Sequence, residues 1–187
     1  MKIIKKAKDE NGEVLFLDPT HQIHNTVNGY CWQGKGLAGT KKFFSNSGRR
    51  RINIIGAINA TTLKPTTVIT EINCDKEIIK KILKKIRKKY INSNTIYIFL
   101  DNARYSKNSY IYDYAKSLNI KLIFLPPYSP NLNLIERLWK FLKKKVRKNI
   151  YYKTFKEFEN AIFKFFRNFK KYKVELKKLL TLKFEII

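Results

Sequence analysis

The chain has 187 residues and a net charge of +26, because 40 Lys and Arg outnumber 14 Asp and Glu. Its length suits one domain, its apolar fraction of 44% is enough for a hydrophobic core, and no run reaches the roughly 18 apolar residues that a membrane-spanning helix needs. So basic a surface attracts polyanions, of which nucleic acid is the commonest inside cells, although an anionic membrane surface is a rival partner.

The first half of the chain predicts strands. Residues 1–12 are polar and charged, and Asn11-Gly12 is a turn signal. Residues 19–49 are glycine-rich and predict an irregular excursion. A turn at 63–65 separates two β-rich runs, which predicts an antiparallel pair. The predicted strands are 13–18, 30–32, 51–58 and 66–72.

The second half predicts helices that alternate with two strands. Asp75 is suited to cap the first helix, whose apolar residues recur at helical spacing. A stripe of phenylalanines between Phe155 and Phe169 recurs at the same spacing, which favours core packing over a platform for stacking bases. The predicted helices are 75–90, 107–118, 132–148, 154–171 and 174–182, and the strands are 95–101 and 121–125.

Apart from the short strand at 30–32 inside the excursion, three strands followed by helix–strand–helix–strand–helix predict an α/β fold with a mixed sheet. We expect a single domain over residues 1–187, with a helical extension from about residue 150. Asp18 and Asp101 each end an apolar strand. They meet at one edge of the sheet if the first strand lies beside the fourth and runs parallel to it.

Asp18, Asp101 and Glu136 are the candidate catalytic residues. Carboxylate oxygens are the ligands that magnesium and manganese prefer, and two such ions can activate a nucleophile and stabilise a leaving oxygen in phosphodiester chemistry. Asp101 has an alternative role as the cap of a turn, and Glu136 has one as the partner of Lys140 four residues on. Glu136 flanks the apolar stripe of its helix, so it can reach the sheet.

The basic segments are candidate contacts to DNA phosphates, with a solvated charged surface as the alternative. They are Lys41 and Lys42, Arg49, Arg50 and Arg51, and Lys140, Lys143 and Lys144. His21 and His24 lack nearby acidic or cysteine ligands, so a phosphate contact or a loop role is favoured over zinc. Cys31 and Cys74 do not suffice for a disulfide framework, which indicates a reducing cytoplasm.

Three segments together resemble the DDE catalytic core of mariner-like insertion-sequence transposases. They are Phe16-Leu17-Asp18, Asp101-Asn102-Ala103-Arg104, and the proline-rich run from Leu125-Pro126-Pro127-Tyr128 to Ile135-Glu136. Between Asp101 and Glu136 lie 34 residues, the spacing of this superfamily. The resemblance runs from about residue 13 to 149.

The resemblance implies a ribonuclease-H-like fold with a five-stranded sheet flanked by helices. It implies cleavage of double-stranded DNA at transposon ends and strand transfer into a target. Asp18 would bridge two Mg²⁺ or Mn²⁺ ions, Asp101 would hold one, and Glu136 would complete the shell of the other. Arg104 lies in the matched motif and is a further candidate for DNA contact. Relatives imply a homodimer on DNA, in the cytoplasm at the nucleoid.

The chain departs from the family pattern in three places. Pro19 stands where many relatives have a glutamate, and Tyr105 and Ser106 stand where many have a histidine. Relatives usually begin with helix-turn-helix domains, which we expect to be absent here. A separate helix-turn-helix chain would then supply end recognition. The alternatives are a non-catalytic remnant that binds DNA and another ribonuclease-H-like nuclease.

Overall fold

The computed structural model describes residues 2–27, 44–46, 48–101, 108–126 and 132–181. Three features predicted from the sequence lie outside these residues. They are the strand at 30–32 with Lys41 and Lys42, the Arg104 segment, and the centre of the proline-rich run.

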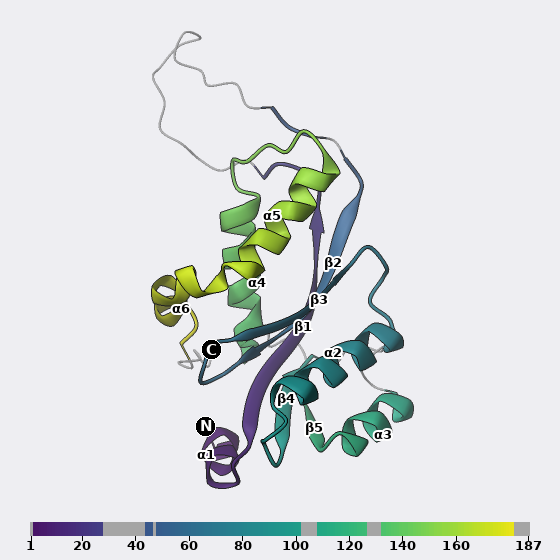
Figure 1. Cartoon of the computed structure of the whole chain (residues 1–187), viewed down its shortest axis with the longest axis vertical. Helices are drawn as coiled ribbons and strands as arrows, with labels where there is room; N and C mark the ends of the chain where they lie inside the picture. The colour runs from purple at the N-terminus through teal and green to yellow at the C-terminus, as the bar shows by residue number, and fades with distance from the viewer. Residues whose placement is uncertain (1, 28–43, 47, 102–107, 127–131, 182–187) are drawn as a thin grey trace.

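The described chain forms one mixed sheet in the order β3-β2-β1-β4-β5 (Figure 1). The strands β1, β2 and β3 pair antiparallel, whereas β1 with β4 and β4 with β5 are parallel. The predicted five-stranded mixed sheet is therefore confirmed, and so is the parallel neighbourhood of the first and fourth strands. The strands are β1 Glu13–Ile23, β2 Arg51–Asn59, β3 Pro65–Thr70, β4 Ile96–Leu100 and β5 Ile120–Phe124.

Helices cover both faces of this sheet (Figure 1). One face packs against α2 and α3, and the other against α4 and α5. Among the described helices, none has both the length and the apolar character to cross a membrane. The helices are α1 Lys2–Asp9, α2 Lys76–Lys89, α3 Ser109–Ser117, α4 Leu134–Val146, α5 Phe155–Arg167, the 3₁₀ helix η3 Phe169–Tyr172 and α6 Lys173–Leu179.

One N-terminal helix was not predicted, and the predicted end of the first strand was wrong. Residues 2–9 form the helix α1, whose charged sequence hides a short apolar side that includes the buried Ala7. The strand β1 does not end at Asp18 but continues to Ile23, because β2 pairs with it from Leu15 to Ile23. Pro19 is tolerated there, since among the described residues the pairing of β1 with β4 ends at Phe16.

Side chains alternate between two hydrophobic layers along the strands. Leu15 and Leu17 of β1 belong to the layer under α2 and α3. Phe16 of β1 and Phe99 of β4 belong to the layer under α4, where their rings stack with centroids 5.1 Å apart. The phenylalanine stripe of α5 completes that layer through the buried Phe158 and its neighbours, as predicted. By the same alternation, the residues two positions after these rings face α4 as well.

The helix α2 begins where the sequence predicted. The Asp75 carboxylate accepts a hydrogen bond from the backbone N–H of Ile78 at 3.0 Å, so it satisfies one of the free donors at the helix start. The apolar stripe Ile78, Ile79, Ile82, Leu83 and Ile86 is buried under the sheet.

We predict that Asp75→Ala lowers the free energy of unfolding by about 1 kcal/mol, because the capped N–H loses its partner. Urea denaturation followed by circular dichroism measures this change. Asp113→Ala, which removes an exposed carboxylate from α3, is the matched control. Equal stabilities of the two variants would contradict the capping role.

Candidate active site

Asp18 and Asp101 face the same side of the sheet. Phe16 and Phe99 are partners in the register of β1 and β4, and their stacked rings lie under α4. Because side chains alternate along a strand, the residues two positions further on each chain, Asp18 and Asp101, follow on that side. Asp18 is half-buried and Asp101, directly after β4, is exposed. The two carboxylates therefore lie at the carboxyl end of the parallel pair, above an apolar layer.

Glu136 lies in the first turn of α4, the helix that packs on β1 and β2. The apolar stripe of this helix is buried against β1 and β2, as the sequence predicted, and Glu136 flanks it half-buried. A hollow of about 170 Å³ lies between helix and strand. Its walls are Asp18, Pro19, Thr20 and Gln22 from β1, with Glu136, Trp139, Lys140 and Lys143 from α4. Asp18 and Glu136 thus share one concave site.

The pKa values of Asp18 and Glu136 are both raised. Burial raises the pKa of Asp18 to about 8, the charge of Asp101 adds to the rise, a hydrogen bond from Trp139 opposes it, and Glu136 contributes further. Burial also raises the pKa of Glu136, with Lys140 opposing the rise and Asp101 adding to it. Such a cluster ionises fully only when cations neutralise it.

The donor set suits a divalent cation, although the described residues do not form a closed metal cage. Within residues 2–101 and 108–181, apart from the gaps already given, no three His, Cys, Asp or Glu side chains converge as metal ligands do. Carboxylate oxygens are nevertheless the ligands that Mg²⁺ and Mn²⁺ prefer. A bound cation would also neutralise the repulsion between these neighbouring carboxylates. Asp18, Asp101 and Glu136 are the residues that would hold such ions.

A contact between Trp139 and Asp18 was missed by the sequence reasoning. The indole Nε1–H of Trp139 donates a hydrogen bond to Asp18 Oδ2 at 3.0 Å. The apolar spacing of α4 predicts a core position for Trp139, which is correct for its buried ring but overlooks its polar atom. The available signal was Gly56, a glycine inside a β-rich run, because such a glycine often marks a close approach.

The predicted basic residues divide into two groups. Lys140 and Lys143 line the hollow beside Asp18, and Lys144 is exposed on the same helix. Arg50 and Arg51, at the far end of β1, instead have partners within the fold. Arg50 pairs with Glu71 at 2.9 Å and stacks on the Phe155 ring at 3.9 Å, whereas Arg51 donates to Asn73 at 2.7 Å. Arg49 is exposed.

His24 has a packing role. It lies 8% exposed between Phe155 and Phe158, and its Nε2 is 2.9 Å from the Tyr152 carbonyl oxygen. It therefore joins the end of β1 to the start of α5. His21 is exposed on the opposite side of the strand.

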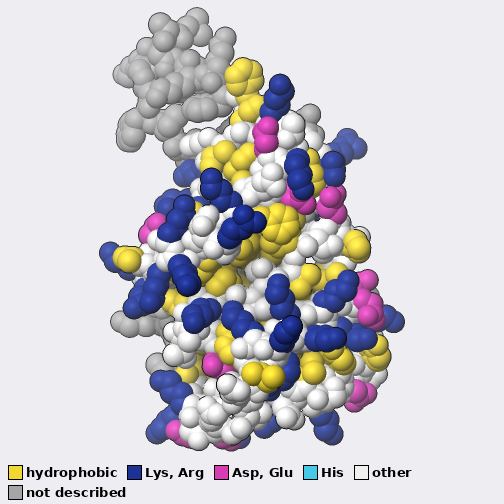
Figure 2. Space-filling view, in the orientation of Figure 1, with side chains coloured by type: hydrophobic (Ala, Val, Ile, Leu, Met, Phe, Trp, Pro, Cys, Tyr) yellow, Lys and Arg dark blue, Asp and Glu magenta, His cyan; other side chains and the backbone are white. Residues whose placement is uncertain are grey.

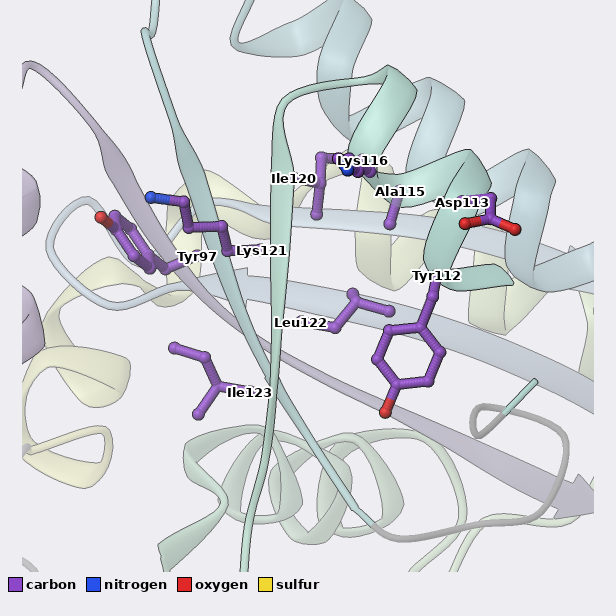
Figure 3. A pocket seen from close by; sticks show the side chains of 9 residues that line it. All are labelled: Tyr97, Tyr112, Asp113, Ala115, Lys116, Ile120, Lys121, Leu122 and Ile123. Atoms are coloured by element: carbon purple, nitrogen blue, oxygen red, sulfur yellow. The ribbon is translucent and has the colours of Figure 1, made fainter. Parts of the chain in front are cut away.

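Neither overall charge nor hollow size locates the site by itself. Figure 2 shows Lys and Arg side chains spread over a whole face, with fewer Asp and Glu among them. A larger hollow of about 470 Å³ lies at the sheet edge, with Tyr97 and Lys121 on one side of β5 and Leu122 and Tyr112 on the other (Figure 3). It contains one carboxylate, Asp113, whereas the hollow between β1 and α4 contains two, Asp18 and Glu136.

The family model of the DDE superfamily endonucleases matches residues 13–159, most of the chain. The chain belongs to this family. The matched range includes Asp18, Asp101 and Glu136, and therefore the whole candidate site.

The DDE domain is similar to one curated protein and to solved structures of the Mos1 transposase. It is 28% identical over 153 residues to the insertion element IS630 uncharacterized 39 kDa protein of Shigella sonnei, covering 80% of this chain and 44% of that protein. The catalytic domain of Mos1 mariner transposase has a TM-score of 0.61 at 11% identity, covering 95% of this chain and 83% of that one.

The Mos1 mariner paired end complex with Mn has a TM-score of 0.65 at 10% identity, covering 100% of this chain and 60% of that one. The DDE domain thus spans about half the length of the IS630 protein and of the full Mos1 chain. These likenesses confirm the ribonuclease-H-like fold that the sequence predicted.

We predict that the metal-free domain loses stability as the pH rises from about 4 to about 8. Asp18 has its pKa raised from 3.8 to about 8, so in this window the folded state binds a proton that the unfolded state has released. The slope should reach up to about 1.4 kcal/mol per pH unit. Urea unfolding at several pH values in EDTA measures it.

Asp18→Asn should reduce this slope, whereas Asp113→Asn, on α3, should keep it. The assignment to Asp18 is wrong if Asp18→Asn unfolds with the parent's pH dependence.

Proposed function

We propose that this chain is the catalytic domain of a transposase, which uses two divalent cations to cut DNA at transposon ends and join the cut strands to a target. The observation that carries the proposal is the position of Asp18, whose pKa is raised first by burial and then by the nearby charges of Asp101 and Glu136. A carboxylate cluster that resists ionisation in a protein of net charge +26 is suited to hold cations and an anionic polymer together.

The three carboxylates would hold the divalent ions together. Asp18 and Glu136 line the same hollow, and the charge of Asp101 acts on both of them. When bound, Mg²⁺ or Mn²⁺ supplies activation of the attacking oxygen and charge stabilisation of the leaving oxygen. The Mos1 paired end complex with Mn supports this choice of ion by analogy of fold.

The reaction proceeds in two displacements at phosphorus. Water attacks a phosphodiester at the transposon end, and the P–O bond to the 3′ oxygen breaks to leave a 3′ hydroxyl. That hydroxyl then attacks a phosphodiester of the target, where the bond from phosphorus to the target's own 3′ oxygen breaks and leaves a 3′ hydroxyl on the target strand. Lys140 and Lys143, which line the hollow beside the carboxylates, are placed to bind the flanking phosphates.

The proposal extends to partners. Double-stranded DNA is the substrate, and we propose that a second copy of this chain binds the same DNA. The setting would be the nucleoid in the cytoplasm.

We predict that the chain nicks supercoiled plasmid in Mn²⁺ and that Asp18→Asn, Asp101→Asn and Glu136→Gln each lower the rate roughly 100-fold or more, since loss of outer-shell partners alone reaches that size. Gel electrophoresis of initial rates measures this effect. Asp113→Asn is the control that should nick at the parent's rate.

A folded parent that binds DNA without nicking would contradict an autonomous enzyme and favour a DNA-binding remnant. Nicking without joined products, on DNA carrying matched ends, would favour another ribonuclease-H-like nuclease.

We also predict that Lys140→Ala and Lys143→Ala weaken duplex binding and each reduce the slope of log affinity against log salt by about 1. Fluorescence anisotropy in a salt series measures both quantities. Lys84→Ala, an exposed lysine of α2 on the opposite face of the sheet, is the matched control. Equal slopes for all three variants would place the DNA elsewhere.

A further inference from the structure

We propose that Trp139 is a positioning residue, which is seated on Gly56 and holds the Asp18 carboxylate in place for divalent cations. The inference rests on the proposed function, because it concerns how the same carboxylates are arranged. It assigns a role to two residues that carry no negative charge and would not themselves touch the DNA or a cation.

The contact between Trp139 and Asp18 is short and sheltered. The indole Nε1–H lies 3.0 Å from Asp18 Oδ2, and Trp139 is 7% exposed. An indole N–H can only donate, so it orients an ionised carboxylate without competing for cations. Hydrogen bonds to charged groups are also the stronger kind. The Oδ2 atom of Asp18 is therefore held, and the orientation of Oδ1 is fixed with it.

Gly56 provides the space that this contact needs. Gly56 of β2 is the register partner of Asp18 on β1, so both residues lie side by side under α4. A Cβ atom at residue 56 would meet Trp139 Cη2 at 2.5 Å and Cζ2 at 3.0 Å. The first distance is shorter than real Cβ contacts and the second is tighter than most of them, so a side chain at residue 56 would displace the indole. A glycine weakens the middle of a strand. The space that the indole of Trp139 occupies explains why β2 has a glycine at this position.

The link also sets how far Asp18 lies from Glu136. Trp139 follows Glu136 by three residues, so one turn of α4 carries both side chains. The hydrogen bond ties this turn to β1, while Ile135, Leu138 and Leu142, each 0% exposed, anchor the helix on the sheet. Two carboxylates that repel each other are thereby kept at one side of the same hollow.

The test is divalent cation affinity of the metal-free protein, measured by calorimetric titration with Mn²⁺ and without DNA. Trp139→Phe keeps an aromatic ring and removes the N–H. We expect its affinity to fall about 10- to 100-fold, as for loss of other partners that orient metal ligands. Phe165→Leu, which trims a buried ring of α5 away from the hollow, is the control and should bind Mn²⁺ as the parent does.

A second pair of variants tests the seat itself. Gly56→Ala keeps the indole N–H but should displace it, so Mn²⁺ affinity should fall in this variant as well. Cζ2 and Cη2 are atoms of the indole that phenylalanine lacks. The added methyl group should therefore destabilise the parent more than it destabilises Trp139→Phe, which a double-mutant cycle of unfolding free energies measures.

The outcomes separate this inference from the proposed function. A parent that binds neither Mn²⁺ nor Mg²⁺ overturns both. A parent that binds Mn²⁺, with Trp139→Phe and Gly56→Ala binding it equally well, overturns the positioning role alone. The Trp139 indole N–H resonance, identified by its loss in Trp139→Phe, should also shift on saturation with Mg²⁺, and an unmoved resonance counts against the role.

Discussion

The register of β1 against β4 is the constraint on which the candidate site depends. These strands are parallel neighbours although about 80 residues separate them in the chain, and their pairing ends with Phe16 opposite Phe99. A slip of one residue would turn Asp18 to the opposite face from Asp101, and each to the wrong helix layer. The buried layers on both faces resist such a slip, because Leu15 and Leu17 would exchange places with Phe16 and Asp18. The hydrophobic core therefore determines the electrostatics of the site.

That core also explains why the pKa of Asp18 is raised in the absence of cations. The stacked rings of Phe16 and Phe99 are packed in the apolar layer next to Asp18, and burial is the largest cause of the raised pKa of Asp18. Burial and like charge both favour a protonated Asp18, whereas the indole of Trp139 favours the ionised form. The rest of the molecule is strongly basic, and Lys140 and Lys143 line the same hollow. The site thus combines carboxylates that cations would stabilise with lysines that attract an anion.

Much of this could be predicted from the sequence, where local patterns are decisive. The Asp75 cap, the apolar stripe of α4 and the position of Asp101 directly after β4 are each contained in a short segment. The continuation of β1 past Asp18 was not predictable in that way, since Pro19 and the polar residues after it resemble a loop, and only pairing with β2 makes them a strand. The contact of Trp139 with Asp18 depends on three elements, so no single segment reveals it.

The long separation between β1 and β4 has a consequence for synthesis. The meander of β1, β2 and β3 has local connections and can form early as the chain leaves the ribosome, because domains fold as their segments emerge. Asp101 joins Asp18 only when β4 has paired, and Glu136 and Trp139 arrive later still, with α4. A nascent chain therefore carries Asp18 without its partners until most of the domain has been made. An incomplete chain that lacks α4 therefore cannot form the complete candidate site.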